Sequence, residues 1–130
     1  MPDVNLLAIL VSAVVVFVIG FTYYAVLGER LAEVSDAAVA GEQPPPWKMA
    51  VEFSRGLILA AVIAGLASEA EIDEWTAGLL LGLALWTGFP FVLWTGAVIH
   101  ENTPVKLAAI HAGDWLVKLA VVAVIVSVWQ

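Results

Sequence analysis

Four long apolar stretches dominate the sequence and constrain what this chain can fold into. They run from Leu6 to Leu27, from about Met49 to Ala67, from Trp75 to Ile99 and from about Leu107 to Trp129. A helix needs about 20 apolar residues to span the hydrocarbon layer of a bilayer, because its backbone groups must bond internally where water is absent. Each stretch meets this length, so the sequence predicts four membrane-spanning helices.

The composition supports the same environment. Of the 130 residues, 62% are hydrophobic and only 13% are charged, which is more apolar surface than a soluble domain of this length can bury. The net charge is −7 and the sequence has no cluster of Lys and Arg, so nucleic acid is excluded as a partner. Cysteine is absent, so there is no disulfide, thiol nucleophile or thiolate metal site. The predicted partner is the lipid bilayer, and no cofactor is indicated.

The first stretch could instead be a cleaved signal peptide. Ala38-Val39-Ala40 resembles a signal-peptide cleavage site. The apolar run is, however, longer than a signal core, no Lys or Arg precedes it, and the Ala-x-Ala lies well beyond its end. We therefore expect a retained transmembrane helix.

The connections between the stretches predict a compact bundle. The first connection, residues 28–47, is the longest, and Leu31, Val34 and Ala38 follow helical spacing in it. This spacing predicts a short interfacial helix, which the run of prolines at residues 44–46 must end. The other two connections, residues 68–74 and 100–106, have the length of hairpin turns. The predicted fold is all-α and integral to the membrane: one up-down bundle of four transmembrane helices, forming a single domain over residues 1–130.

The basic residues predict the orientation of this bundle. Arg30 and Lys48 lie in the first connection and Lys106 lies in the third, whereas the acidic second connection and both terminal segments have none. Lys and Arg in short loops are retained on the cytoplasmic side. The sequence therefore predicts a multi-pass protein of the cell membrane with both termini outside.

Three polar residues of the fourth stretch fall on one face of a helix. His111, Asp114 and Lys118 are spaced by three and four residues, which places them within about 60° of one another. Counted from Leu107 at 1.5 Å per residue, Lys118 lies roughly 16 Å deep, near the middle of the hydrocarbon layer. An unpaired charge there costs at least about 2.5 to 3.5 kcal/mol. We expect Lys118 to pair with Asp114 and to face the interior of the bundle.

Glu52 and Arg55 lie near the cytoplasmic end of the second stretch, also about 60° apart, and they balance the formal charge of Asp114 and Lys118. We call Glu52, Arg55, His111, Asp114 and Lys118 the polar cluster. Ionisable groups within a membrane often mark function, so the cluster is a candidate site for an ion, a proton or a small polar ligand, open to the cytoplasm. Alternatively, the protein is a structural or accessory subunit whose ion pairs only fix helix packing. Both interpretations remain open.

Metal binding and catalysis have little support in the sequence. His100, Glu101 and His111 match no ligand spacing of a known metal site, so we expect none. Three serines lie in the apolar stretches, at Ser12, Ser54 and Ser127. None has a base and an orienting acid at helical spacing, so an enzyme is not expected.

Glycine and proline predict local features of the third stretch. Pro90 lacks a backbone donor and clashes with the carbonyl of Trp86, which predicts a kink near Gly88. Gly78 and Gly82 are four residues apart and permit another helix to approach closely. Packing within the bundle is favoured over packing between subunits, and a homo-oligomer remains the alternative.

Several segments together resemble a known family. They are the Asn5–Leu10 segment followed by Gly20 and the Tyr23-Tyr24 pair, Gly82 with the Trp86–Pro90 segment, and the His111–Lys118 segment ahead of Trp129. On these segments the chain resembles the bacterial membrane proteins grouped as domain-of-unknown-function family 1761, with a longer first connection. The resemblance implies four spans in a bacterial inner membrane, and it implies no particular activity.

Overall fold

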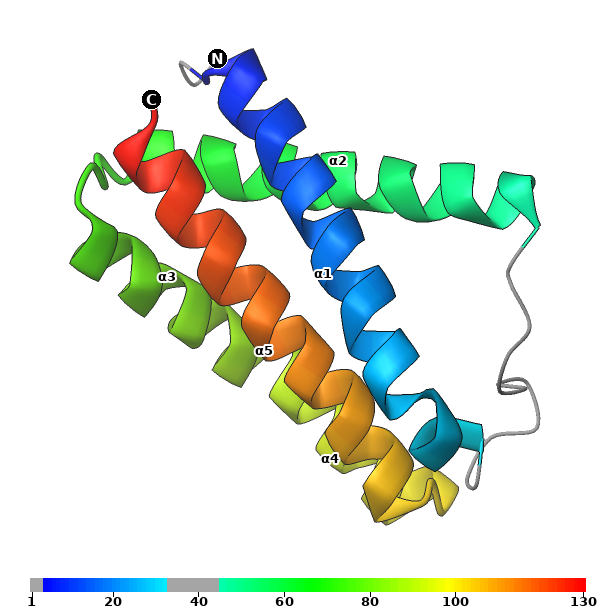
Figure 1. Cartoon of the computed structure of the whole chain (residues 1–130). Helices are drawn as coiled ribbons and strands as arrows, with labels where there is room; N and C mark the ends of the chain where they lie inside the picture. Colours follow the sequence, from blue (N-terminus) through cyan, green and yellow to red (C-terminus); the bar gives the residue numbers. More distant parts are fainter. Residues whose placement is uncertain (1–3, 33–44) are drawn as a thin grey trace.

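The structure is a computed structural model that describes residues 4–32 and 45–130, with the side chains of the first range described up to Leu27. It is all-helical (Figure 1). The helices are α1 (Leu6–Ala32), α2 (Pro46–Glu69), α3 (Trp75–Gly88), α4 (Pro90–Glu101) and α5 (Val105–Val128). Helices α3 and α4 form one apolar span, so four segments are long and apolar enough to cross a membrane. This confirms the predicted fold class.

The ends of the spans follow from local chemistry. Helix α2 begins at Pro46, because a proline in the first turn needs no hydrogen-bond donor and its φ is already helical. Helix α4 ends at Glu101 and is capped by Asn102, which adopts the left-handed conformation with φ 55° that Asn tolerates better than most residues. Pro104 then precedes α5. Leu31 belongs to α1, whereas Val34 and Ala38 of the predicted interfacial helix lie outside the described residues.

The third span is interrupted at the position of the proline. Helix α3 ends at Gly88 and α4 begins at Pro90, with φ −121° and ψ −76° at Phe89 between them. The Phe89 amide still donates to the Leu85 carbonyl, and the Leu93 amide donates to the Phe89 carbonyl. These bonds keep the two helices within one span. Pro90 is buried, and Gly88 is exposed: apart from its own helix backbone and chain neighbours, no atom of the described residues lies within 4 Å of the position that a Cβ would take.

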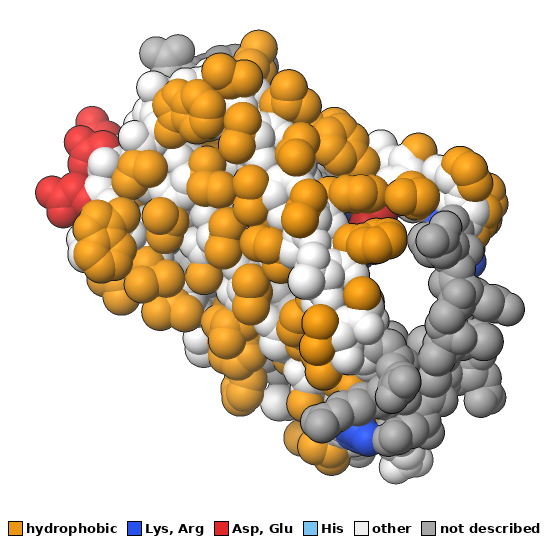
Figure 2. Space-filling model, in the orientation of Figure 1, with side chains coloured by type: hydrophobic (Ala, Val, Ile, Leu, Met, Phe, Trp, Pro, Cys, Tyr) orange, Lys and Arg blue, Asp and Glu red, His pale blue; other side chains and the backbone are white. Residues whose placement is uncertain are grey.

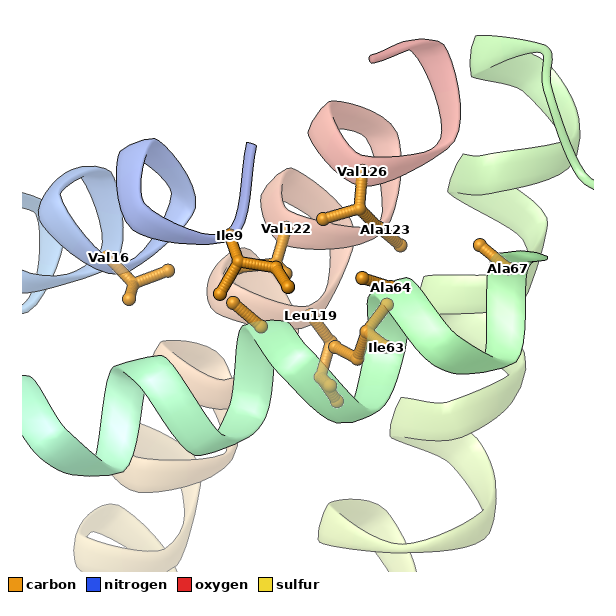
Figure 3. Packing of buried hydrophobic residues seen from close by; sticks show 10 residues of the cluster. Ile9, Val16, Ile63, Ala64, Ala67, Leu119, Val122, Ala123 and Val126 are labelled. Carbon is orange, nitrogen blue, oxygen red and sulfur yellow. The ribbon is translucent and has the colours of Figure 1, made fainter. Parts of the chain in front are cut away.

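Helix α5 is the central element, because it packs against each of the other four helices. Ile9 of α1, Ile63 of α2 and Val122 of α5 belong to one cluster of buried apolar residues (Figure 3). Small residues such as Ala64 and Ala123 lie beside them and let the helices approach closely. Gly78 and Gly82 are the buried residues of α3, and the atoms nearest their faces belong to α5. The glycine face is therefore used inside the bundle.

Helix α2 does not run alongside its neighbours. Figure 1 shows it crossing α1 and α5 obliquely. Its buried residues, Gly56, Ala60, Ile63, Ala64 and Ala67, all lie in the part of the helix that follows Arg55. The N-terminal turns of α2 therefore make few buried contacts, which leaves the side chains of Glu52 and Arg55 partly open.

The outer surface suits a lipid environment. Large apolar side chains are exposed on every span, among them Leu6, Ile58, Leu80 and Val128. Figure 2 shows hydrophobic side chains spread across the visible face, with acidic side chains gathered at the end where α2 turns into α3. Both termini lie toward that end of the molecule, and the α4–α5 turn lies at the opposite end (Figure 1). The protein is therefore a multi-pass membrane protein in a lipid bilayer.

Candidate intramembrane polar site

An ion pair buried on α5 forms the centre of the site. Lys118 Nζ lies 2.8 Å from Asp114 Oδ2, one helical turn away. Asp114 is 2% exposed and Lys118 is 9% exposed. This is the pair that the four-residue spacing predicts. In such a dry environment each charge is stabilised by the other, since removing one partner leaves an uncompensated buried charge.

Two neighbouring tyrosines of α1 reach across to α5. The Tyr24 hydroxyl lies 3.1 Å from Asp114 Oδ2, to which it can donate, and 2.8 Å from His111 Nδ1. The Tyr23 hydroxyl donates to the Ile110 carbonyl at 2.5 Å. A Cβ at Gly113 would lie 2.7 Å from the Tyr23 oxygen, so the glycine makes this approach of α1 to α5 possible. Neither tyrosine was among the predicted site residues.

Helix α2 supplies the exposed end of the network. Arg55 binds Glu52 through NH1 and Oε2 at 2.7 Å, and Lys118 Nζ lies 3.7 Å from Glu52 Oε1. The side chains of Arg55 and Glu52 are 58% and 44% exposed. The structure thus brings all five residues of the polar cluster into one network with Tyr24. The network leads from a buried carboxylate on α5 to a partly exposed carboxylate on α2.

A small recess opens beside this network. Its volume is about 20 Å³, which is room for one molecule of the size of water. The lining residues are Val16, Phe17, Glu52, Arg55, Gly56, Leu59, Trp115 and Lys118. The Lys118 ammonium lies 5.6 Å from the centre of the Trp115 ring, within range of a cation–π contact. The recess therefore offers two cations, one carboxylate and an aromatic face.

One oxygen of the Asp114 carboxylate has no hydrogen-bond donor among the described residues. Asp114 Oδ2 takes both Tyr24 and Lys118, while Oδ1 is buried and has no hydrogen-bond partner within residues 4–27 and 45–130. Buried carboxylate oxygens are normally bonded, because losing water without a replacement is costly. Asp114 therefore has capacity for one further donor.

Aromatic rings hold the histidine in place. His111 stacks on Trp94 of α4, with ring centres 5.0 Å apart and an angle of 15° between the planes. The Tyr24 ring lies 5.7 Å away from the histidine ring. Trp94 was not part of the predicted site. Its ring fixes the plane of the imidazole, and Tyr24 fixes the direction of Nδ1.

The remaining polar residues lie apart from this network. His100 and Glu101 are exposed in the last turn of α4. The described residues contain no group of three His, Asp or Glu side chains placed to hold a metal ion. Ser12 and Ser127 are buried with no hydrogen-bond partner in the described part of the chain, and the Ser54 hydroxyl donates to the Ala50 carbonyl. Among the residues that the structure describes, none of these serines is hydrogen-bonded to an acid or a base that would activate it.

Four apolar spans and a network of ionisable side chains between them define the class: a four-span α-helical membrane protein that carries charge within its spans. A family model described as "Protein of unknown function (DUF1761)" matches residues 7–127. The chain belongs to this family, which confirms the resemblance drawn from its sequence. No curated protein and no solved structure matches the chain.

Proposed function

We propose that the polar cluster binds a small ion. One observation carries the proposal: the Asp114 carboxylate is 2% exposed and, among the described residues, its Oδ1 has no donor, although Lys118 and Tyr24 both bond to its Oδ2. A pair selected only for packing would gain by satisfying both oxygens, since an unmet buried acceptor costs about 1 to 3 kcal/mol. A binding site requires an acceptor, such as this oxygen, that is available to a ligand.

The size of the recess supports an ion rather than an organic ligand. A volume of about 20 Å³ beside Glu52, Arg55 and Lys118 admits a single water-sized species. Sites for organic ligands are usually several hundred cubic ångströms. The proposed activity is binding and not catalysis: the Ser54 hydroxyl donates to a backbone carbonyl, and Ser12 and Ser127 have no hydrogen-bond partner among the described residues.

The second candidate is a structural or accessory subunit. The direct 2.8 Å contact between Lys118 and Asp114 favours it, because each charge already has an opposite charge beside it. In that case the cluster only fixes how α1, α2 and α5 pack. The two candidates differ in whether any ion changes the stability of the protein.

The test is thermal unfolding of the purified full-length protein in detergent, in titrations of sodium, potassium, ammonium, chloride and pH. We expect one of these ions to raise the unfolding temperature, because a ligand at 100 times its Kd stabilises the folded state by about 2.7 kcal/mol. The double substitution Asp114→Leu with Lys118→Met should abolish the response. Ser54→Ala is the matched control and should keep the response, because the Ser54 hydroxyl bonds to the Ala50 carbonyl and not to the network. A wild-type protein that responds to no ion would support the structural alternative.

We further propose that the termini lie outside and that the recess opens toward the cytoplasm, from the positions of Arg30, Lys48 and Lys106 in the sequence. The chain has no native cysteine, so single cysteines can be placed freely. Asp73→Cys in the acidic turn should react with an impermeant thiol reagent added to intact cells. Glu101→Cys at the opposite end should react only after the membrane is opened. The reverse pattern would overturn this orientation.

A further inference from the structure

We propose that the bound ion is the proton, and that His111 and Tyr24 relay it to Asp114, where it releases Lys118 toward Glu52. This inference rests on the proposed function and names the ion for the same site. It is carried by the position of one hydroxyl between two titratable groups and of one ammonium between two carboxylates.

The Tyr24 hydroxyl bridges His111 and Asp114. It lies 2.8 Å from His111 Nδ1 and 3.1 Å from Asp114 Oδ2. A tyrosine hydroxyl has a single hydrogen, so it donates to one neighbour and accepts from the other. Two arrangements therefore fit the same heavy atoms. In one, His111 Nδ1 carries a hydrogen and Asp114 is a carboxylate; in the other, Nδ1 is free and Asp114 carries the hydrogen.

Changing from the first arrangement to the second moves one proton. The N–H bond at His111 Nδ1 breaks as that proton joins the Tyr24 oxygen, and the original Tyr24 proton moves to Asp114 Oδ2. If the histidine begins as the doubly protonated cation, it ends neutral and the carboxylate ends as a neutral acid. The total charge is unchanged, and Tyr24 ends as it began.

Lys118 can respond to this change. Its ammonium lies 2.8 Å from Asp114 Oδ2 and 3.7 Å from Glu52 Oε1, so two carboxylates share one cation. A neutral Asp114 attracts the ammonium less, and Glu52 becomes the stronger partner. Gly20 of α1 faces Lys118: a Cβ there would lie 3.6 Å from Cε and 3.7 Å from Nζ. The glycine leaves space beside the end of the lysine side chain.

The groups around Asp114 favour a proton over a metal cation. Helix α1 presents Tyr23 and Tyr24, α2 presents Glu52 and Arg55, and α5 presents Lys118. Helix α3 has no titratable residue, and the titratable residues of α4, His100 and Glu101, are exposed at its end.

The carboxylates of Asp114 and Glu52 therefore already face the cations of Lys118 and Arg55. A metal ion would have to displace one of these cations. A proton instead uses hydrogen bonds that exist. Protonation also turns the unpartnered Oδ1 of Asp114 into an oxygen of a neutral acid, which is less costly to bury.

Infrared difference spectra of the full-length protein in lipid nanodiscs test where the proton goes. Lowering the pH should produce the carbonyl band of a protonated carboxylic acid. Asp114→Asn should remove this band, and Glu52→Gln should keep it. A band that Glu52→Gln removes and Asp114→Asn keeps would overturn the assignment, as would the absence of any band.

The relay is tested by the rate at which the band grows after a rapid drop in pH. Tyr24→Phe keeps the ring but removes the bridging hydroxyl, and it should slow the growth about tenfold or more. Tyr23→Phe is the matched control, because its hydroxyl bonds to the Ile110 carbonyl and not to the relay. His111→Gln removes the first proton carrier and should slow the growth as Tyr24→Phe does. Rates equal to wild type in both variants would overturn the relay.

The response of Lys118 has its own readout. The chain has three lysines, Lys48, Lys106 and Lys118, so nuclear magnetic resonance of labelled lysine side chains can resolve Lys118. The signal that is lost in Lys118→Met is assigned to Lys118. Its signal should shift at the same pH as the infrared band, and Glu52→Gln should reduce the shift. A Lys118 signal that does not shift at the pH where the infrared band appears would contradict the release of Lys118 toward Glu52.

Failure of this inference is distinguishable from failure of the proposed function. If sodium, potassium, ammonium or chloride raises the unfolding temperature and no carboxylic acid band forms, the site binds another ion and the proton assignment is wrong. If neither effect is seen, both proposals fail and the structural subunit stands.

Discussion

Replacing Lys118 with Met should destabilise the folded protein by about 3 to 5 kcal/mol, because the change leaves a charged Asp114 buried without its partner. Asp114 is 2% exposed, so water cannot replace the ammonium that lies 2.8 Å away. Met is close to Lys in shape and keeps the packing of the side-chain stem. The free energy of unfolding in detergent, measured with chemical denaturant, checks the prediction. The deficit should shrink at low pH, where a protonated carboxyl is neutral and costs less to bury.

The double variant tests whether the loss of stability comes from the unpaired charge of Asp114. Asp114→Leu combined with Lys118→Met removes both charges, and replacing a buried pair with apolar residues is often nearly neutral. The double variant should therefore recover most of the stability that Lys118→Met loses. Arg55→Met is the matched control: its partner Glu52 and its own side chain are partly exposed, so the loss should stay below about 1 kcal/mol. If Lys118→Met is as stable as wild type, the ion pair is not the centre of a dry network.

The spans could be read from the sequence because membrane length and backbone bonding leave few alternatives. The predicted span from Leu6 to Leu27 matches the apolar part of α1. Helices α2 and α5 begin a few residues before the predicted starts, at Pro46 and Val105. Hydropathy does not detect these first turns, since polar or proline residues there are set by capping and not by lipid.

The buried ion pair was also predictable, whereas its surroundings were not. A spacing of four residues fixes Asp114 and Lys118 on one face of one helix whatever the neighbours are. The sequence does not say which helix covers that face or at what angle. It therefore could not predict that α2 crosses obliquely and leaves Glu52 and Arg55 partly exposed.

Tyr24 and Trp94 were not predicted as site residues, because spacing within one span does not relate an aromatic ring to a residue of another span. Tyr24 near the end of the first span and His111 near the start of the fourth lie at similar depth when the two spans run in opposite directions. Comparing the depths of residues along antiparallel helices would have predicted the contact between Tyr24 and His111. Trp94 had no such signal, because its stacking on His111 depends on how α4 continues after the break at Phe89.

Replacing Gly82 with Ala should destabilise the protein by about 1 to 3 kcal/mol, the usual cost of forcing extra atoms into a packed core. A Cβ at Gly82 would lie 2.7 Å from the Leu119 carbonyl oxygen and 3.0 Å from the Ala120 Cα. Both atoms belong to the backbone of α5, so the clash cannot be relieved by turning a side chain. Helices α3 and α5 would have to separate.

Gly96→Ala is the matched control for this change, because it is the same substitution in α4 at a position where a Cβ would meet no atom of the described residues within 4 Å, apart from its own helix backbone and chain neighbours. It should be neutral or should stabilise the protein by up to about 1 kcal/mol, since Ala is the better helix former. Thermal unfolding and gel filtration in the same detergent measure both variants. Packing within one chain predicts that Gly82→Ala lowers stability without changing oligomer size. A variant that stays folded but changes oligomer size would instead place this glycine between subunits, and an unchanged unfolding temperature would contradict the close approach of α3 to α5.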